Sequence, residues 1–283
     1  MVQKAVSIII PAYNEQNAIV STVEDIRKVA KDAEIIVVND GSTDATVSRL
    51  KDMHGIKVIN HPYNKGYGAS LKSGIQAAKN DWILIIDADK TYDAKDIPRL
   101  IEHIPEFDMV VGARTGKSVK VPLARKPAKM MLTLVAQLVA GRKIPDLNSG
   151  LRVFRKEIVE KHYPIFPSGF SFTTTITLVC LTNEYTVKYI EIDYHKREGK
   201  STIHPIKDFL GFMQLIFRTV MYYEPLKIFL PASMLVFLLT GFSMVRDVMI
   251  QGRFGSLSVI LFMTGMQILF FGLLADLINK KTR

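Results

Sequence analysis

The chain has 283 residues, of which 48% are hydrophobic and 23% are charged, and 37 Lys and Arg outnumber 27 Asp and Glu. This length and balance exclude a small disulfide-stapled module, a disordered tail and a fibrous repeat. The single cysteine, Cys180, cannot form an internal disulfide, and no Cys/His cluster offers a zinc site. We therefore expect one sizeable α/β domain with an accessory segment.

The first 113 residues alternate between runs typical of strands and patterns typical of helices. The apolar, strand-like runs lie at 6–10, 34–38, 56–59, 82–86 and 109–111. The amphipathic patterns between them lie near 15–31, 44–53, 67–79 and 95–104. Buried strands separated by amphipathic helices predict a mostly parallel sheet covered on both faces. Because such sheets bind ligands at the carboxyl ends of their strands, the residues after each run are the candidates for function.

The middle of the chain is strongly basic. Residues 114–161 carry 12 basic and 3 acidic side chains, a net charge of +9. Such a block indicates either a face for phosphate, anionic lipid or nucleic acid, or an ordinary solvated surface. No pattern of a nucleic-acid reader is present, so nucleic acid is not an expected partner. A helix is predicted over 126–141, and strands are predicted over 151–155 and 187–194.

Two apolar runs near the C-terminus predict a membrane hairpin. Residues 226–245 contain one charge, Lys227, and residues 257–275 contain none. At about 1.5 Å per residue, each run spans roughly 30 Å, the thickness of a hydrocarbon core. The connecting loop is expected over 246–254. The alternative, two buried helices of a soluble domain, is disfavoured because neither run has a polar face.

Basic residues outside these runs predict the orientation of the hairpin. Such residues precede the first run and follow the second, so the positive-inside rule places both ends and the bulk of the chain in the cytoplasm. We expect a multi-pass protein of the cell membrane, or of an endoplasmic-reticulum-type membrane in a eukaryote. An amphipathic helix over 206–223 is expected in the membrane interface. Gln267 is costly against lipid and is expected to face a helix of its own chain or of another subunit, which suggests a homo-oligomer.

Asp87-Ala88-Asp89 follows the fourth apolar run. Residues two apart on an extended segment point to the same side, so both carboxylates can reach one hard cation such as Mg²⁺ or Mn²⁺. The alternative is a pair of solvated acids at a strand end.

Two further motifs follow strand-like runs. Asp40 lies in Asp-Gly-Ser after the second run, where it can recognise a nucleotide or can form a turn and helix cap. Residues 64–69 open the next predicted helix, with Lys72 one turn inside, and can bring backbone N–H groups and a cation near a phosphate. This stretch is neither a Walker A loop nor GxGxxG.

Arginines and a carboxylate gather in the basic middle of the chain. Asp146, Ser149 and Arg152 lie within seven residues, and Arg114 and Arg125 precede them. Because arginine binds phosphate in a bidentate fork, phosphate binding is the favoured interpretation of Arg114 and Arg152, and the alternative is that both are solvated at the surface. A basic loop at 195–201 follows the last predicted strand, where it can fold over a diphosphate or anchor to anionic lipid.

The motifs together resemble those of the GT-A-fold glycosyltransferases of family 2, and most of all the polyprenyl-phosphate group that contains the dolichol-phosphate mannose synthases. The resemblance covers about residues 5–205. It is carried, in family order, by Ile10-Pro11-Ala12-Tyr13-Asn14-Glu15, Asn39-Asp40-Gly41-Ser42, Lys65-Gly66-Tyr67-Gly68-Ala69, Asp87-Ala88-Asp89, Gly112-Ala113-Arg114 and Asp146-Leu147-Asn148-Ser149-Gly150-Leu151-Arg152. The implied division is a catalytic domain at 1–204, an interfacial helix at 205–225, and two transmembrane helices with a basic tail at 226–283.

The resemblance implies a UDP- or GDP-sugar donor, a divalent cation and a dolichyl or undecaprenyl phosphate acceptor. It assigns the cation to Asp87 and Asp89, and catalysis to Asp89, Asp146 and Arg114. The implied nucleotide contacts are Pro11, Ala12, Tyr13, Glu15, Asp40, Lys72, Asp87, Ala88, Arg197 and Lys200. The implied acceptor contacts are Arg114, Arg125, Ser149 and Arg152. Mannose synthases of the family commonly have a metal-contacting glutamine where this chain has Thr91, and Lys90 is also unusual, so the sugar and the metal preference stay open.

A phosphate monoester acceptor is already an anion, so sugar transfer to it needs no strong general base. Direct displacement of the donor diphosphate would invert the configuration at the anomeric carbon. One alternative is transfer to a hydroxyl of a lipid or glycan, which requires Asp146 as a base. Another is a membrane protein that binds nucleotide-sugars without catalysis.

Overall fold

The computed structural model describes residues 5–115, 133–134, 136–137, 140–169, 171–195, 217, 220–221 and 224–282. The chain divides into two compact units, Met1–Leu215 and Ile216–Arg283. The first unit contains the sheet and the second contains the hairpin of long helices.

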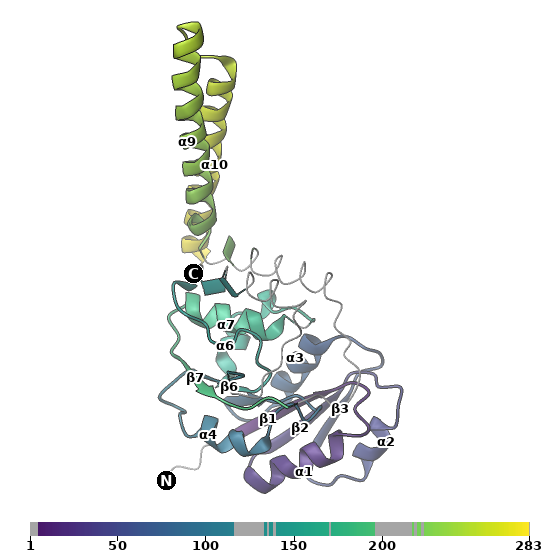
Figure 1. Cartoon of the computed structure of the whole chain (residues 1–283). Helices are drawn as coiled ribbons and strands as arrows, with labels where there is room; N and C mark the ends of the chain where they lie inside the picture. The colour runs from purple at the N-terminus through teal and green to yellow at the C-terminus, as the bar shows by residue number, and fades with distance from the viewer. Residues whose placement is uncertain are drawn as a thin grey trace. The chain divides into compact units, whose positions relative to one another are not determined.

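A seven-stranded sheet forms the centre of the first unit (Figure 1). Its order is β3-β2-β1-β4-β6-β5-β7. The strands are β1 (Val6–Ala12), β2 (Glu34–Asn39), β3 (Lys57–Asn60), β4 (Trp82–Ile85), β5 (Met109–Ala113), β6 (Arg152–Arg155) and β7 (Val187–Glu191). All neighbours pair in parallel except β6, which is antiparallel to both β4 and β5. The prediction of a mostly parallel sheet is therefore confirmed.

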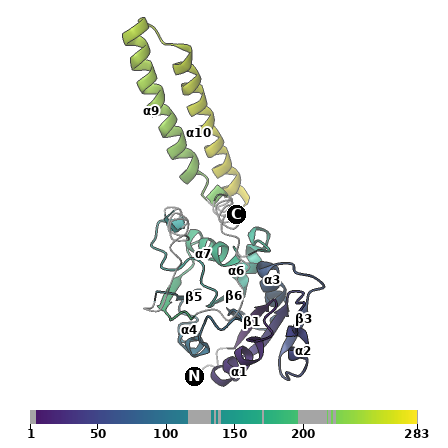
Figure 2. The same ribbon diagram turned by 45° about the vertical axis from the view of Figure 1, so that its right-hand side comes forward.

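Helices cover both faces of the sheet (Figure 2). On one face lie α1 (Ile19–Val29), α2 (Thr46–Lys51) and α4 (Ile97–Ile101), the last preceded by the short 3-10 turn η1 (Ala94–Asp96). On the other lie α3 (Tyr67–Ala77), α6 (Lys156–Lys161), the 3-10 turn η3 (Tyr163–Ile165) and α7 (Phe172–Thr182).

The alternation of β1 side chains explains this layering. Ile8 and Ile10 are fully buried in a cluster that includes Ile26 of α1. Ile9 points to the opposite face, where α3 approaches so closely that a Cβ on Gly74 would lie 2.5 Å from the Ile9 Cγ2 atom. Strands that are apolar at every position are the expected signature of a sheet buried on both faces.

Two features of this unit were not evident in the sequence. β6 is antiparallel because the chain leaves the carboxyl end of β5 and re-enters the sheet from that same edge. Helix α7 is buried almost throughout, including four threonines at 173–175 and 177, and so lacks the polar face that marks an amphipathic helix.

The second unit is a hairpin of α9 (Leu226–Gln251) and α10 (Ser256–Thr282). Each contains a 25-residue segment of mean hydropathy 2.1, long and apolar enough to cross a membrane. The expected nine-residue loop is wrong, because α9 continues through Arg246 and Asp247 and ends at Gly252, whose φ of 67° is the left-handed conformation that favours glycine. The turn therefore occupies only residues 252–255.

A polar cluster closes the hairpin beside this turn. The Asp247 carboxylate is 1% exposed and accepts hydrogen bonds from the Ser258 hydroxyl at 2.5 Å and the Gly255 N–H at 3.0 Å. The Ser258 hydroxyl also lies 2.8 Å from that of Ser243 on α9. These hydrogen bonds join α9 to α10 and fix their register, which apolar packing alone would leave undetermined. Gln267 is exposed on α10, and its expected contact with another helix stays a prediction.

Candidate active site

The carboxyl ends of β1, β2, β4 and β5 lie at one edge of the sheet, and the antiparallel β6 begins at that edge. Arg152 at the start of β6 pairs with Ile85 of β4 and with Val111 of β5. The segment before β6 is thus adjacent to both the Asp87 segment and the Arg114 segment. Motifs separated by more than sixty residues along the chain converge here, as expected for an open α/β sheet.

The carboxylate of Asp87 is held between two other segments of the chain. The Tyr67 hydroxyl, from the first residue of α3, donates to Asp87 Oδ1 at 2.9 Å. On the other side, a Cβ placed on Gly150 would lie 2.4 Å from Asp87 Oδ2, so only glycine fits there. Burial and the Asp87 charge raise the pKa of the Tyr67 phenol well above its ordinary value of 10.0. The phenol therefore remains a hydrogen-bond donor at physiological pH.

Asp89 is held by the residue two positions later. The Thr91 backbone N–H and hydroxyl donate to Asp89 Oδ1 at 3.1 and 2.6 Å. Thr91 is fully buried, so it orients Asp89 and is not placed to contact a cation itself. Lys90 adopts a φ of 57°, and its ammonium lies 3.9 Å from the Asp25 carboxylate on α1. Its charge is thus paired with α1.

The pair Asp87 and Asp89 has the chemistry of a site for Mg²⁺ or Mn²⁺. Both supply carboxylate oxygens, the hard ligands that these cations prefer in proteins. Among the described residues, no group of three or more His, Cys, Asp and Glu side chains is arranged to hold a metal. A cation here would therefore complete its coordination with phosphate oxygens and water, which is the usual manner of Mg²⁺.

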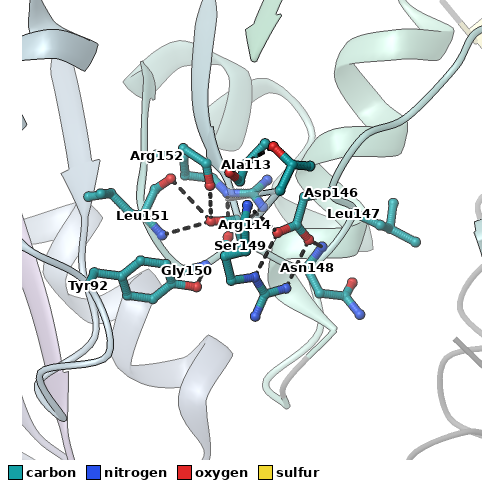
Figure 3. Close-up of polar contacts among 12 residues, drawn as sticks. Tyr92, Ala113, Arg114, Asp146, Leu147, Asn148, Ser149, Gly150, Leu151 and Arg152 are labelled. Carbon is teal, nitrogen blue, oxygen red and sulfur yellow. Dashed lines mark hydrogen bonds and ion pairs between the residues drawn. The ribbon is translucent and has the colours of Figure 1, made fainter. Parts of the chain in front are cut away.

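Arg114 and Asp146 form a bidentate ion pair (Figure 3). The Arg114 Nε and Nη2 atoms donate to Asp146 Oδ2 and Oδ1 at 2.6 and 2.8 Å, and the Arg114 backbone N–H donates to Oδ2 at 3.0 Å. The Asn148 N–H adds a fourth bond to Oδ1 at 3.1 Å. The Arg114 guanidinium also lies 5.1 Å from the ring centroid of Tyr194. Asp146 thus orients an arginine, and taking up a proton would disrupt these bonds.

The structure contradicts the expected phosphate contacts at Ser149 and Arg152 (Figure 3). Arg152 is fully buried, and its guanidinium donates to the Ser149 carbonyl, the Thr173 carbonyl and the Thr177 hydroxyl. Ser149 is also fully buried, and its hydroxyl donates to the Gly112 carbonyl. Both side chains join the start of β6 to its neighbours, so neither is available to contact an acceptor phosphate.

The structure also changes the interpretation of Asp40. Its carboxylate is 3% exposed and accepts hydrogen bonds from the N–H groups of Lys65 and Gly66, at 2.9 and 2.8 Å, and lies 2.7 Å from His61 Nδ1. The Ala69 N–H donates to the Ser168 carbonyl at 3.0 Å. Three amides of the expected phosphate cradle at 64–69, those of Lys65, Gly66 and Ala69, therefore bind the protein itself, which counts against that role. Asp40 positions the loop before α3.

The other predicted nucleotide contacts lie at the end of β1 or on α3. Pro11 and Tyr13 are partly exposed, whereas Ala12 and Glu15 are buried. Ala88 is buried as well, with its carbonyl accepting from the Thr22 hydroxyl at 3.0 Å. Lys72 is half-buried, and its ammonium lies 4.7 Å from the ring centroid of Tyr163. Partial burial lowers its pKa. These nucleotide roles stay predictions.

Several predictions fall outside the described residues. They concern Arg125, Arg197, Lys200, most of the predicted helix at 126–141 and most of the interfacial segment at 205–225.

Comparison with known proteins identifies the family. The model of glycosyl transferase family 2 matches residues 7–163, more than half of the chain. The chain belongs to glycosyl transferase family 2. A second model, the GtrB C-terminal hairpin, matches residues 224–280, which with the two long apolar helices marks a membrane protein. The prediction of a GT-A glycosyltransferase of the polyprenyl-phosphate group is confirmed at this level.

Individual relatives support this assignment. The chain is 28% identical to the undecaprenyl-phosphate 4-deoxy-4-formamido-L-arabinose transferase of Pectobacterium atrosepticum, over 98% of this chain and 89% of that protein. It is 28% identical to the low-salt glycan biosynthesis hexosyltransferase Agl6 of Haloferax volcanii, over 71% of this chain but only 50% of that protein. The chain thus spans half the length of Agl6.

Solved structures show the same fold. Glucosyl-3-phosphoglycerate synthase from Mycobacterium tuberculosis, in complex with Mn²⁺, UDP and phosphoglyceric acid, superposes with a TM-score of 0.60 at 19% identity, covering 77% of this chain and 78% of that one. The same enzyme has also been solved with Mg²⁺ and UDP. This similarity confirms the GT-A fold.

Three residues of this family 2 site escaped the sequence interpretation. Tyr67 lies inside a motif whose glycines and backbone are its recognisable features in the sequence. Tyr92 accepts a hydrogen bond from the Gly150 N–H at 2.6 Å, and its ring contacts that of Tyr194 edge to face. His61 bridges Asp40 and the Ser73 hydroxyl on α3, the latter at 2.9 Å. Each of these side chains contacts residues distant in the sequence, so no short sequence motif could have identified its role.

Proposed function

We propose that this chain transfers a sugar from a nucleotide-sugar to a polyprenyl phosphate, with inversion at the anomeric carbon. The arrangement of Asp146 carries the proposal. Its carboxylate is bound by the Arg114 guanidinium and two backbone N–H groups, so the site offers a fixed cation and no available base there. An acceptor that is already an anion needs that combination, because the cation orients it and no proton has to be removed.

The proposed donor is a UDP- or GDP-sugar bound along the carboxyl ends of β1 and β4. Pro11 and Tyr13 are partly exposed there, and Asp87 and Asp89 lie at the end of β4. The two carboxylates would hold Mg²⁺ or Mn²⁺ together with the donor diphosphate. When bound, the cation would neutralise charge on the departing nucleoside diphosphate. Arg197 and Lys200, outside the described residues, are proposed to assist this on the donor side.

The proposed reaction breaks one bond and forms one bond. An acceptor phosphate oxygen attacks the anomeric carbon, and the bond from that carbon to the donor diphosphate breaks, so the nucleoside diphosphate leaves with the bonding electrons. Arg114, oriented by Asp146, holds the attacking phosphate, and Arg125 is proposed to share this role. Attack from the side opposite the leaving group inverts the configuration at the anomeric carbon.

The membrane hairpin suits a lipid acceptor. A polyprenyl phosphate cannot leave the bilayer, so its phosphate must be met at headgroup depth. Undecaprenyl-phosphate transferase activity is named for the Pectobacterium relative, which this chain matches over 89% of that protein's length. We propose that both ends of the hairpin and the catalytic unit face the cytoplasm, where nucleotide-sugars are made, and that the exposed Gln267 contributes to a homo-oligomer.

Two alternatives are disfavoured by the same residues. Transfer to a hydroxyl requires a general base, and the four hydrogen bonds on Asp146 count against that role. A binding protein without catalysis has no need for a pair of oriented carboxylates beside a positioned arginine.

The experiment that tests the proposal uses the full chain in membranes. We would incubate it with a panel of labelled UDP- and GDP-sugars and a polyprenyl phosphate, and extract the lipid fraction. We expect one donor to give a labelled lipid that mild acid hydrolyses, as a sugar phosphodiester does, and we expect Asp89→Asn to abolish the label. A labelled product that survives mild acid would support the hydroxyl acceptor. Donor binding without transfer to any acceptor would support the non-catalytic alternative.

A further inference from the structure

Tyr67 connects helix α3 to the carboxylate pair. It is the first residue of α3, whereas Asp87 follows β4, and the 2.9 Å hydrogen bond between them crosses from one element to the other. None of the nucleotide, acceptor or catalytic roles proposed above uses this phenol. Asp89 has its support from its own turn, through Thr91. Asp87 is supported from a different part of the chain, through the Tyr67 hydroxyl.

The backbone around Tyr67 is fixed on both sides. Before it, the Gly66 N–H donates to Asp40 at 2.8 Å, and after it the Ala69 N–H donates to the Ser168 carbonyl at 3.0 Å. Gly68 approaches the 167–169 segment so closely that a Cβ there would lie 2.3 Å from the Pro167 carbonyl oxygen. The position of the phenol is therefore set by the main chain.

The opposite side of the Asp87 carboxylate is equally confined. Gly150 lies against Asp87 Oδ2, and the Gly150 N–H is itself held by the Tyr92 hydroxyl at 2.6 Å. The Asp87 carboxylate is thus confined between the Tyr67 hydroxyl and the main chain of Gly150. A single conservative substitution, Tyr67→Phe, removes the hydroxyl. Groups that orient a metal ligand in this way commonly raise metal affinity by about 10- to 100-fold.

We propose that Tyr67 is a positioning residue for Asp87, whose hydrogen bond sets the carboxylate orientation that binds a divalent cation. This inference rests on the cation site of the proposed function. The hydroxyl need not touch the donor, the acceptor or the cation. The hydrogen bond lowers the free-energy cost of fixing the Asp87 carboxylate when the cation binds. Loss of the hydroxyl therefore weakens metal affinity but leaves the chemical step intact once the metal is bound.

The test compares Mn²⁺ binding by the purified full chain and by Tyr67→Phe, measured from the electron paramagnetic resonance of free Mn²⁺ without donor or acceptor. We expect the Kd for Mn²⁺ to rise about 10- to 100-fold in Tyr67→Phe while the Tm stays unchanged. The matched control is Tyr185→Phe, because Tyr185 lies just before β7, at the other edge of the sheet, and contacts His162. Asp89→Asn reports binding at the site itself.

A second measurement separates positioning from damage to the fold. Where the transferase assay gives a product, activity of Tyr67→Phe should return to within about threefold of the wild type at saturating Mn²⁺, whereas a misfolded site is not rescued by metal. An unchanged Kd in Tyr67→Phe, with Mn²⁺ bound by the wild type and lost in Asp89→Asn, would overturn the proposal and leave the proposed function standing. If the wild type fails to bind Mn²⁺ both alone and with a nucleoside diphosphate present, both the cation site and this inference are wrong.

Discussion

The guanidinium of Arg114 donates two hydrogen bonds to the carboxylate of Asp146, with Nε–Oδ2 and Nη2–Oδ1 distances of 2.6 and 2.8 Å. The pair joins the end of β5 to the segment before β6, at the edge of the sheet where Asp87 also lies. A bidentate pair fixes the plane of the guanidinium as well as its position. In the proposed function, this fixed geometry would let Arg114 meet the acceptor phosphate without reordering at the moment of reaction.

The first prediction concerns Asp146. Asp146→Asn removes one charge from a pair whose side chains are 16% and 2% exposed, which leaves the Arg114 guanidinium without its counter-ion. We expect the free energy of unfolding to fall by about 3 kcal/mol, the lower end of the range for removal of one partner of a buried ion pair. Transferase activity should fall with it, because Arg114 is no longer held.

The pH dependence distinguishes this role from that of a base. If Asp146 only orients Arg114, the residual activity of Asp146→Asn keeps the shape of the wild-type pH–rate profile, whereas removal of a general base abolishes its acid limb. Asp93→Asn is the control, since Asp93 pairs with the exposed Lys95 on a surface turn. Loss of the acid limb in Asp146→Asn but not in Asp93→Asn would support transfer to a hydroxyl acceptor.

The second prediction concerns Gly150. A Cβ at this position would lie 2.4 Å from Asp87 Oδ2, far inside van der Waals contact, so Gly150→Ala must displace the carboxylate. We expect Mn²⁺ affinity to fall at least tenfold, measured in the same titration as for Tyr67→Phe. Gly141→Ala controls for the general effect of a glycine substitution in this region, because a Cβ there meets nothing within 4 Å, although its φ of 64° adds some strain. Equal Mn²⁺ affinity in Gly150→Ala and the wild type would contradict the contact.

The sequence predicted the sheet, its buried strands and the edge at which the motifs converge, because these follow from hydrophobic periodicity along short segments. It also placed Asp87 and Asp89 correctly at the end of a buried strand. It could not show that Arg152 is internal, since an arginine that binds phosphate and one that binds carbonyl groups look the same in a motif. The sequence also could not show the role of Asp40, because its hydrogen-bond partners His61 and Gly66 lie 21 and 26 residues away.

The third prediction tests the corrected role of Arg152. Arg152→Lys keeps the charge but cannot reproduce the fork that binds the Ser149 and Thr173 carbonyls and the Thr177 hydroxyl. We expect about 3 kcal/mol less stability, because buried acceptors lose a charged donor. The folded fraction should keep its KM for polyprenyl phosphate. A raised KM without a stability change would show that Arg152 meets the acceptor after all.

The fourth prediction concerns stability against acid. Asp108, before β5, accepts hydrogen bonds from the Thr186 N–H and hydroxyl at 2.9 and 2.8 Å and from Arg155 Nε at 2.8 Å. Partial burial raises the pKa of this carboxyl, but the bonds from Thr186 and the charge of Arg155 outweigh it, so the pKa lies below its ordinary value of 3.8. A lowered folded-state pKa stabilises the fold above pH 3.8, and that contribution is lost as the pH falls through the folded value.

Asp108→Asn should therefore unfold at lower denaturant concentration than the wild type at pH 7, and the gap should shrink as the pH falls below 3.8. Denaturation curves of the full chain in detergent between pH 3 and pH 7 measure this. Asp25→Asn is the control, because Asp25 lies on an exposed face of α1 with its carboxylate 46% exposed. A gap that grows in acid would reverse the sign of the inferred shift.

The last prediction concerns the orientation of the hairpin, and the single native cysteine makes it accessible. Cys180 is fully buried, and burial raises the pKa of its thiol, so it stays unreactive toward a maleimide in the folded chain. Phe254→Cys introduces a thiol in the turn between α9 and α10, where Phe254 is 62% exposed. Lys280→Cys introduces one near the end of α10, where the Lys280 side chain is 76% exposed.

If both ends of the hairpin face the cytoplasm, a membrane-impermeant maleimide labels Phe254→Cys only in right-side-out vesicles and Lys280→Cys only in inside-out vesicles. The excess of basic residues at the two ends over the turn drives this arrangement. The unsubstituted chain, labelled in parallel, measures the background from Cys180. The reverse pattern would place the catalytic unit on the side away from the nucleotide-sugars, while equal labelling of both thiols in one vesicle type would mean that the hairpin does not cross the membrane.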